Sequence, residues 1–295
     1  MRTMIHPQLQ QLINLGLLLL LGKYAAHIYL PWKNIVLILL VTMGVEHLIL
    51  YVKEKEITFF SFSSLSTAIG VMLMMVTPHL WITLLVITFG LLQKHFLHYQ
   101  GKHFFNPSNF ALMAGLLFFY HDAHIVLGQL GENIWLGILV IVLGAAILYR
   151  VDRWIIPVSF AAVYLLLQYI FIVKSDPVLI MEEVYYRFYS VSFIVFILFM
   201  LTDPKTTPQK HWQQLLFAIV IAFGATLLDY NNGFRVQHLF MVLFAASTMV
   251  PLFTGWQETR QKKILIAMSS GLLLLALGAI IYIEMQPPYY FEMNG

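Results

Sequence analysis

The chain contains no cysteine. Disulfide bonds, thiolate metal ligands and cysteine-ligated iron–sulfur clusters are therefore excluded, and any redox chemistry would have to come from an organic cofactor or from a partner protein. Charged residues are also scarce, at 11% of 295 residues, whereas 60% are hydrophobic and the mean hydropathy is +0.80. This composition excludes an ordinary soluble domain and indicates a membrane protein. No run rich in lysine and arginine indicates a nucleic-acid partner.

The first apolar stretch, 11–22, is not followed by a clear small-x-small cleavage site, so we expect it to remain as the first membrane helix. Apolar runs between polar breaks predict eleven helical segments, which makes the fold class an all-α polytopic membrane protein. The third, fifth, eighth and tenth segments are short or interrupted by polar residues. The predicted segments are 11–31, 34–52, 59–77, 79–99, 107–120, 133–150, 154–173, 186–202, 208–228, 233–253 and 263–284.

Basic residues are distributed unequally between the predicted loops. With the N-terminus inside, twelve of the seventeen Lys and Arg residues fall on the inner side and four on the outer side. Because cytoplasmic loops carry the excess of positive charge, we expect a multi-pass protein of the bacterial inner membrane with a cytoplasmic N-terminus and the lipid bilayer around it. The inner residues are Arg2, Lys53, Lys55, Lys94, Lys102, Arg150, Arg153, Lys205, Lys210, Arg260, Lys262 and Lys263, and the outer ones are Lys33, Lys174, Arg187 and Arg235.

Two apolar hairpins broken by proline recur with the same internal spacing. Pro78 and Asn106 are 28 positions apart (106 − 78), and so are Pro204 and Asn232 (232 − 204). The offset of 126 residues between the prolines (204 − 78) also superposes the first two segments on the sixth and seventh. Repeats of five segments have opposite orientations in the membrane, as in transporters built from inverted repeats.

The expected organisation therefore has four parts. The ranges are 1–120 for the first membrane repeat, 121–132 for an outer loop between the repeats, 133–255 for the second membrane repeat, and 256–295 for an extra C-terminal transmembrane helix and tail.

The hairpins carry residues that begin helices. Thr77-Pro78, Thr207-Pro208 and Asn106-Pro107 each place a capping side chain before a proline, and Asn232-Gly233 is a close variant. A helix that begins inside the bilayer directs free N–H groups and a positive dipole end at the centre, where an anionic or strongly polar ligand would bind. The alternative is that these dipeptides are ordinary turns at the membrane surface.

Several acidic residues admit two interpretations. Asp203 could hold an ion, pair with Lys205 or cap free amides, or it could be a plain helix cap facing the cytoplasm. Glu46 lies inside the second predicted span, where ionisable residues are functional by default, but it could also reach the membrane interface. Asp229 and Arg235 could simply pair with each other. We assign the histidines to the membrane interface and predict no metal site.

Four stretches with this order and spacing resemble a known family. They are S-S-L-S-T-A-I-G-V-M-L-M (63–74), K-H-F-F-N-P-S-N-F-A-L-M-A-G (102–115), W-I-I-P-V-S-F (154–160) and T-D-P-K-T-T-P (202–208). They are similar to motifs of the RnfD/NqrB membrane subunits of Rnf and Na⁺-translocating NADH:quinone oxidoreductase complexes. The likeness covers roughly residues 55–255.

This resemblance implies a ten-helix inverted-repeat fold, similar to urea transporters, and a flavin attached through its phosphate to a threonine. In the family that threonine lies in an S-G-A-T motif on the outer loop between the repeats. The corresponding loop here, 121–133, contains neither serine nor threonine. Covalent FMN is therefore not expected, and Gly224-Ala225-Thr226 lies inside the ninth segment, the wrong place for the motif.

The resemblance favours a membrane component of electron transport, associated with ion translocation and redox partner subunits, that binds FMN or riboflavin non-covalently. Whether the chain is itself an oxidoreductase subunit stays open, and no catalytic residue is assigned. The alternatives are a transporter or channel for a small polar solute through the cavity between the repeats, and a scaffold for partner proteins. The residues expected to bind cofactor or substrate are Ser64, Thr67, Asn106, Ser108, Asn109, Thr202, Asp203, Lys205, Thr206 and Asn232.

Overall fold

The protein is almost entirely helical. The computed structural model describes residues 6–26, 28, 30–55, 60–127, 129–174, 187–254 and 259–287. Each of the eleven predicted segments contains helix in its described residues, and the tenth contains two helices, which confirms the all-α polytopic fold class. The first five are α1 (Pro7–Ala25), α2 (Trp32–Glu54), α3 (Phe62–Met74), α4 (Leu80–Phe96) and α5 (Pro107–Phe118).

The second half has the same succession of long and short helices. Two of its helices, α7 and α9, continue directly into the π-helices η1 and η2. The elements are α6 (Ile134–Val151), α7 (Ile155–Leu167), η1 (Gln168–Val173), α9 (Val191–Val195), η2 (Phe196–Met200), α10 (His211–Asn232), α11 (Gln237–Ser247), α12 (Val250–Thr254) and α13 (Thr259–Glu284).

Two short antiparallel strand pairs, which the sequence does not predict, hold loop segments together in the described part of the chain. β1 (Met75–Val76) pairs with β4 (His124–Ile125), and β2 (His98–Tyr99) pairs with β3 (Lys102–His103). Strands of two residues carry too little hydrophobic alternation to be recognised in a sequence.

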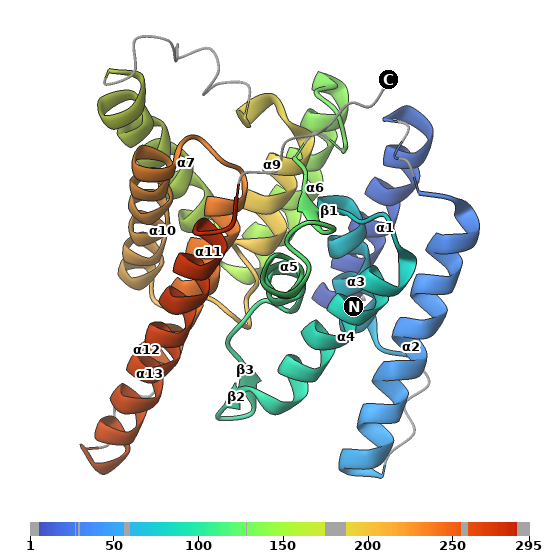
Figure 1. Cartoon of the computed structure of the whole chain (residues 1–295), viewed down its shortest axis with the longest axis horizontal. Helices are drawn as coiled ribbons and strands as arrows, with labels where there is room; N and C mark the ends of the chain where they lie inside the picture. The colour runs from blue at the N-terminus through green and yellow to red at the C-terminus, as the bar shows by residue number, and fades with distance from the viewer. Residues whose placement is uncertain are drawn as a thin grey trace, which may run out of the picture.

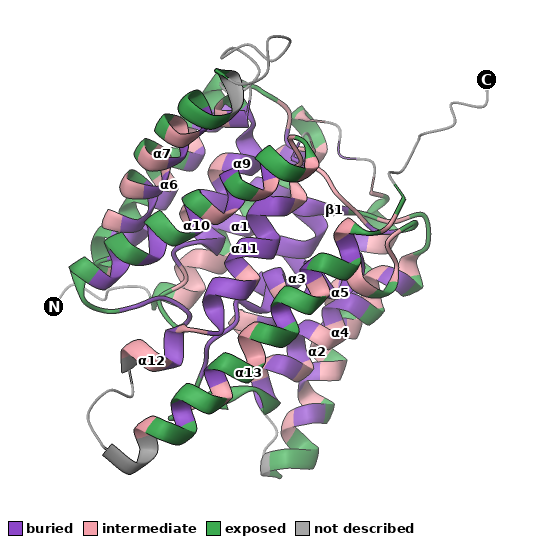
Figure 2. Ribbon diagram, turned by 60° about the vertical axis from the view of Figure 1, so that its left-hand side comes forward, coloured by how far each residue is buried: buried purple, intermediate pink, exposed green. Residues whose placement is uncertain are grey.

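Within the described residues, four helices are long and apolar enough to cross a membrane, namely α2, α6, α10 and α13. Their exposed faces are apolar, as Leu40, Val142 and Leu274 illustrate, so these faces suit contact with lipid. The short helices α3, α5 and α11 are instead buried on almost every side, in the interior of the molecule (Figure 2). The chain is a multi-pass membrane protein whose short helices lie inside a shell of longer ones.

The same pairs of helices pack together in both halves. In the first half α1 contacts α3, α2 contacts α4, and α4 contacts α5. In the second half α6 contacts α9, α7 contacts α10, and α10 contacts α11. The halves meet where α1 lies against α6 and α5 against α11 (Figure 1). The repeat and its inverted orientation stay predictions.

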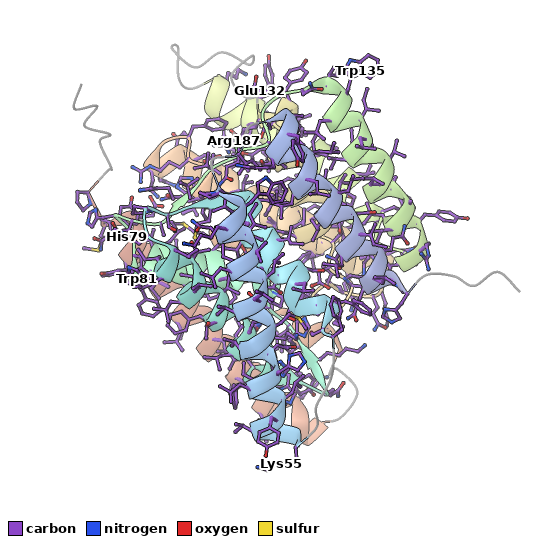
Figure 3. The ribbon with its side chains drawn as sticks, turned by 90° about the vertical axis from the view of Figure 1, so that its right-hand side faces the viewer. Lys55, His79, Trp81, Glu132, Trp135 and Arg187 are labelled. Carbon is purple, nitrogen blue, oxygen red and sulfur yellow. The ribbon has the colours of Figure 1, made fainter. Side chains whose placement is uncertain are left out.

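One predicted inner loop and one predicted outer loop lie at opposite ends of the molecule. Lys55, which ends α2, lies at one tip, whereas Glu132 and Trp135, at the start of α6, lie at the other (Figure 3). This separation agrees with a membrane between them. The direction of the chain across that membrane stays a prediction.

Two of the predicted helix caps are wrong. α4 and α10 begin only after Thr77-Pro78 and Thr207-Pro208, with His79 and Lys210 at their N-caps. The hydroxyl of Thr77 instead lies 2.7 Å from that of Thr83. Thr207 donates to the carbonyl of Asp203 at 2.8 Å and accepts from Arg153 at 3.0 Å. Both threonines therefore stabilise the connection that precedes the helix.

The second Asn turn also differs from its prediction. α10 continues through Asn232 and ends at Gly233, whose φ of +83° is a backbone conformation that favours glycine. α11 begins at Gln237 without a side-chain cap. Asn232 therefore ends one helix and does not begin the next.

Candidate functional site

A cavity of about 470 Å³ lies where the two halves of the chain meet. It is enclosed by the start of α1, one face of α3, the start of α5, the inner face of α6, η2 and the loop that follows η2. Its lining residues are His6, Pro7, Gln8, Gln11, Leu15, Ser63, Ser66, Thr67, Gly70, His103, Asn106, Pro107, Ser108, Ile147, Val151, Val195, Phe199, Met200, Asp203, Pro204 and Lys205.

The polar face of α3 forms one wall of this cavity. Ser63, Ser66, Thr67 and Gly70 follow the i, i+3, i+4, i+7 spacing of a single helix face. The hydroxyls of Ser66 and Thr67 donate to backbone carbonyls one turn earlier, at 2.9 Å each. Because those donors are used, the hydroxyl oxygens can still accept a hydrogen bond from a ligand.

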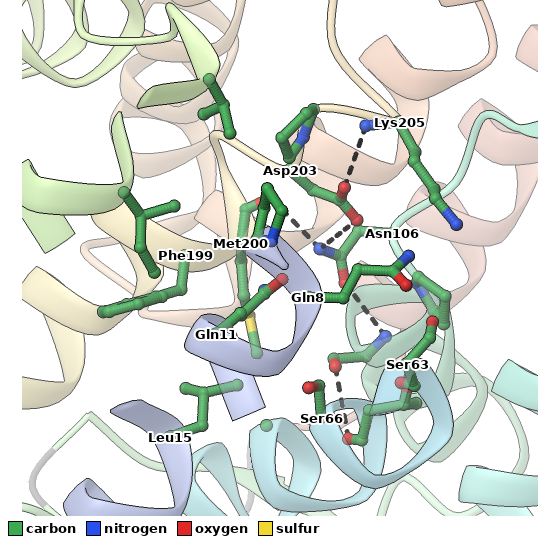
Figure 4. Close-up of a pocket in the computed structure, with 18 of the residues that line it drawn as sticks. Gln8, Gln11, Leu15, Ser63, Ser66, Asn106, Phe199, Met200, Asp203 and Lys205 are labelled. Atoms are coloured by element: carbon green, nitrogen blue, oxygen red, sulfur yellow. Dashed lines mark hydrogen bonds between the residues drawn. The ribbon is translucent and has the colours of Figure 1, made fainter. Parts of the chain in front are cut away.

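Asn106 connects the two halves. Its side-chain oxygen accepts from the backbone N–H groups of Ser108 and Asn109 at 3.0 and 3.1 Å, so it caps α5 as the sequence predicts. Its amide nitrogen donates across the cavity to the carbonyl of Met200 at 3.3 Å and reaches Asp203 at 3.5 Å (Figure 4). One buried side chain therefore fixes the start of α5 against the end of η2.

Asp203 caps a free amide, which was one of the roles expected for it. One carboxylate oxygen accepts from the backbone N–H of Lys205 at 3.0 Å, and the other faces Asn106. The carboxyl is half-buried, and burial raises its pKa although the amide and ammonium of Lys205 and the guanidinium of Arg153 act in the opposite direction. A hydrogen-bond acceptor is therefore held at the rim of the cavity.

Apolar side chains complete the cavity opposite these polar groups. Leu15, Ile147, Phe199 and Met200 come from α1, α6 and η2. A wall of this kind beside convergent donors and acceptors is typical of small-molecule and cofactor sites. The arrangement suits a ligand with one flat apolar part and one edge that both donates and accepts hydrogen bonds.

The cavity brings together half of the residues that the sequence analysis selected. Thr67, Asn106, Ser108, Asp203 and Lys205 line it. The other five, Ser64, Asn109, Thr202, Thr206 and Asn232, do not belong to the lining.

The selected residues outside the lining have local roles. Ser64 donates to the carbonyl of Ser61 at 3.0 Å, and Thr202, in the turn after η2, donates to the carbonyl of Leu198 at 2.6 Å. Asn109 donates to the carbonyl of Phe240 at 3.2 Å and so ties α5 to α11. Asn232 lies at the end of α10, and Thr206 donates to the Asp203 carbonyl at 3.4 Å.

Sequence reasoning missed the contribution of α1. Gln8, Gln11 and Leu15 line the cavity from the first two turns of that helix. Their i, i+3, i+7 spacing places these three residues on one face of α1. The i, i+3 spacing of Ser63 and Ser66 places those two on one face of α3 in the same way. The sequence carries no signal that the two faces look into the same space.

A buried charged cluster surrounds Glu46 in the first half. Its carboxylate pairs with Lys94 and lies 3.0 Å from the ring of His95, while Ser61 donates to it at 3.0 Å. Glu46 is 2% exposed, so these partners hold its carboxylate inside the protein.

A second buried cluster surrounds Asp229. Its side chain contacts Arg187 at 3.3 Å and His238 at 2.7 Å. The proposed pairing of Asp229 with the Arg235 side chain is wrong, because that guanidinium contacts Glu284 at 3.3 Å and only the Arg235 backbone N–H reaches Asp229. The sequence missed this arrangement because Glu284 comes from α13, far along the chain.

Comparison with known proteins gives one family. Residues 120–264 match the model described as the NQR2, RnfD, RnfE family. The matched range contains the W-I-I-P-V-S-F and T-D-P-K-T-T-P stretches, whereas the F-N-P stretch lies before it. A search of curated proteins found no match.

Proposed function

We propose that the chain is a membrane component of electron transport and that it binds a flavin non-covalently in the Asn106–Asp203 cavity. The match of residues 120–264 to the NQR2, RnfD, RnfE family supports this RnfD/NqrB-like function. The family suggests a membrane subunit of an ion-translocating electron-transport complex, with redox partner subunits beside it. The bacterial inner membrane, with the N-terminus in the cytoplasm, is the proposed location.

The composition of the cavity is the observation that carries this proposal. A volume of about 470 Å³ lies within the range of cofactor pockets, roughly 300–1,000 Å³. A flavin ring has two flat apolar faces and one polar edge with both carbonyl and N–H groups. Leu15, Phe199 and Met200 suit the faces, while Ser66, Thr67 and Asp203 suit the edge.

Each polar side chain has a definite part in this proposal. Asp203 accepts a hydrogen bond from a ring N–H, and the hydroxyls of Ser66 and Thr67 accept further ones. Asn106 holds the loop of Asp203 in place through its own hydrogen bonds. Lys205, at the mouth of the cavity, attracts a phosphate if the ligand is FMN. When bound, the flavin supplies one- and two-electron redox chemistry, which this cysteine-free chain has no other group to perform.

Attachment of the flavin is non-covalent in this proposal. The loop at 121–133 offers no hydroxyl side chain for a phosphoester bond. It also lies at the end of the molecule near Glu132, whereas residues at the start of α1 line the cavity.

Flavin titration of the purified protein tests the proposal. Riboflavin and FMN are added to the flavin-free protein in nanodiscs, and quenching of flavin fluorescence gives each Kd. Asp203→Asn should weaken binding by about tenfold or more, because a hydrogen bond to a charged acceptor contributes about 1.5–3 kcal/mol. Lys205→Gln should weaken FMN more than riboflavin.

The matched control is Asp152→Asn, since Asp152 is an exposed carboxylate that contacts His211 away from the cavity. Its affinity for both flavins should equal that of the wild type. A protein that carries no yellow chromophore when purified and binds neither flavin when supplied would contradict the proposal.

Transport of a small polar solute is the second candidate, favoured by the neutral hydroxyl and amide groups of Ser63, Ser66 and Asn106 in the same cavity. Liposomes containing the protein separate the two functions. Uptake of urea, ammonium or another small solute that stops when Ser66 is replaced with leucine would support transport. No flux for any solute of the panel, together with flavin binding, would support the redox function.

A further inference from the structure

A second and larger cavity, of about 770 Å³, adjoins the first. It lies between the β2–β3 hairpin, the loop before α10, the start of α10 and α12. The two cavities share His103, Pro204 and Lys205. The full lining is Tyr99, Gln100, Lys102, His103, Phe104, Pro204, Lys205, Thr207, Gln209, Lys210, Trp212, Gln213, Leu216, Met249, Val250, Pro251, Leu252 and Phe253.

The charge of this lining has one sign. Lys102, Lys205 and Lys210 contribute three ammonium groups, and the lining contains no aspartate or glutamate. None of the ion pairs found in the described part of the chain uses any of the three. The lysines are exposed and converge from two separate segments, so an anion in the cavity would meet several positive charges at once.

The remaining wall of the cavity is apolar and continues onto the surface of α10. Trp212 and Leu216 line the cavity and are 60% and 42% exposed. The same face of α10 carries Ile219, Val220 and Phe223, which are also exposed. α10 is one of the helices able to cross the membrane, so this face suits contact with acyl chains. An occupant with an anionic head and an apolar tail would use both parts of the wall.

We propose that this second cavity binds the phosphate head group of an anionic phospholipid, with its acyl chains along the exposed face of α10. Basic pockets beside membrane helices on the cytoplasmic side bind such head groups, and β2 and β3 lie on the same side of the molecule as the end of α2 (Figure 1). Trp212, which lines this cavity and is exposed, is of the residue type enriched where membrane helices meet the head groups. The proposal goes beyond the flavin site and does not depend on it.

The shared residue Lys205 connects this lipid to the first cavity. Lys205 belongs to the lining of both cavities, and its backbone N–H donates to Asp203 at 3.0 Å. A phosphate in the second cavity draws the Lys205 side chain toward itself and away from the first. Anionic lipid is therefore expected to lower the affinity of the first cavity for any second phosphate.

Quenching of Trp212 by brominated lipids tests the proposal. The full chain is placed in nanodiscs with equal fractions of brominated phosphatidylglycerol or brominated phosphatidylcholine. The signal of this tryptophan is isolated by subtracting the emission of Trp212→Phe. Phosphatidylglycerol should quench it at several times lower mole fraction than phosphatidylcholine, since each lysine near a head group contributes roughly fivefold to binding.

The variant Lys102→Gln/Lys210→Gln should remove most of this preference, because it removes two of the three ammonium groups that line the cavity. Lys205 is left intact because it also lines the first cavity. The control Lys55→Gln/Lys263→Gln removes the same charge from exposed positions outside the cavity and should keep the preference. Flavin affinity, measured in the same nanodiscs with riboflavin, should be unchanged in both double variants.

Three results would overturn the proposal. These are equal quenching by the two lipids, a preference for phosphatidylglycerol that survives in Lys102→Gln/Lys210→Gln, and loss of the preference in the control variant. Inorganic phosphate at millimolar concentration distinguishes a free-anion site: if it binds and phosphatidylglycerol shows no preference, the occupant is not a lipid. A failure to bind flavin affects none of these readings.

Discussion

Replacing Asn106 with alanine removes two sets of hydrogen bonds from one buried position. The first is the cap of α5, where the side chain accepts from the N–H groups of Ser108 and Asn109. A lost asparagine cap costs about 1 kcal/mol. The second is the donor to the Met200 carbonyl, and a buried group left without its partner costs about 1–3 kcal/mol. We expect Asn106→Ala to lower the free energy of unfolding by about 3 kcal/mol.

Asn133 provides the matched control, because it caps α6 with the same geometry. Its side chain accepts from Trp135 and Leu136 at 3.0 and 3.2 Å, but it is exposed to solvent. Water replaces the lost acceptor there, so Asn133→Ala should cost only about 1 kcal/mol. Asn106→Asp should keep the α5 cap, but it loses the donor and places a second carboxylate against Asp203.

Reversible unfolding in mixtures of dodecyl maltoside and sodium dodecyl sulfate, followed by tryptophan fluorescence, measures these differences. The order of stability should be wild type, then Asn133→Ala, then Asn106→Ala. If the two alanine variants lose the same stability, Asn106 acts only as a helix cap and the link that it forms between the two halves adds nothing.

Two further predictions concern residues beside the cavity. Gly90→Ala should destabilise the protein by roughly 1–3 kcal/mol, because the new Cβ would lie 2.5 Å from the backbone oxygen of Pro107. The control Gly44→Ala, whose new Cβ would meet nothing within 4 Å, should be neutral or slightly stabilising in the same unfolding measurement. Equal effects of the two substitutions would show that α4 and α5 can separate freely. Burial, with Lys205 acting in the same direction, lowers the pKa of His103 to about 3. The unfolded chain then binds a proton near pH 6.5 that the folded protein does not bind, so stability falls as the pH is lowered from 8 to 5, by about 2 kcal/mol from this residue. His103→Gln should remove that part of the pH dependence, and an unchanged slope would contradict the assignment.

The positions of the helices could be predicted because they depend on local properties. A run of apolar residues of membrane length forms a helix whatever surrounds it, since every backbone polar group must be satisfied within the segment. All eleven segments were found this way. Asn106 was identified as a helix cap for the same reason, because a cap needs only the two N–H groups that follow it in the chain.

The side chains of the site were predicted only in part. Ser64 and Thr67 were both selected, yet only Thr67 lines the cavity, because α3 turns the neighbouring Ser63 and Ser66 toward it and Ser64 away. The i, i+3 spacing shows that Ser63 and Ser66 share a face. It does not show which face meets the other half of the chain.

The sequence by itself determined the membrane class, the order of helices, the likeness of residues 120–264 to the NQR2, RnfD, RnfE family and the lack of serine and threonine in the loop at 121–133. Only the tertiary structure decided which residues share a space. Gln8 and Asp203 line one cavity, and Lys102 and Lys210 line another, although each pair is separated by most of a repeat or more. The physical reason is that helix formation is local, whereas a cavity arises from the packing of segments whose distance in space has no fixed relation to their distance in the chain.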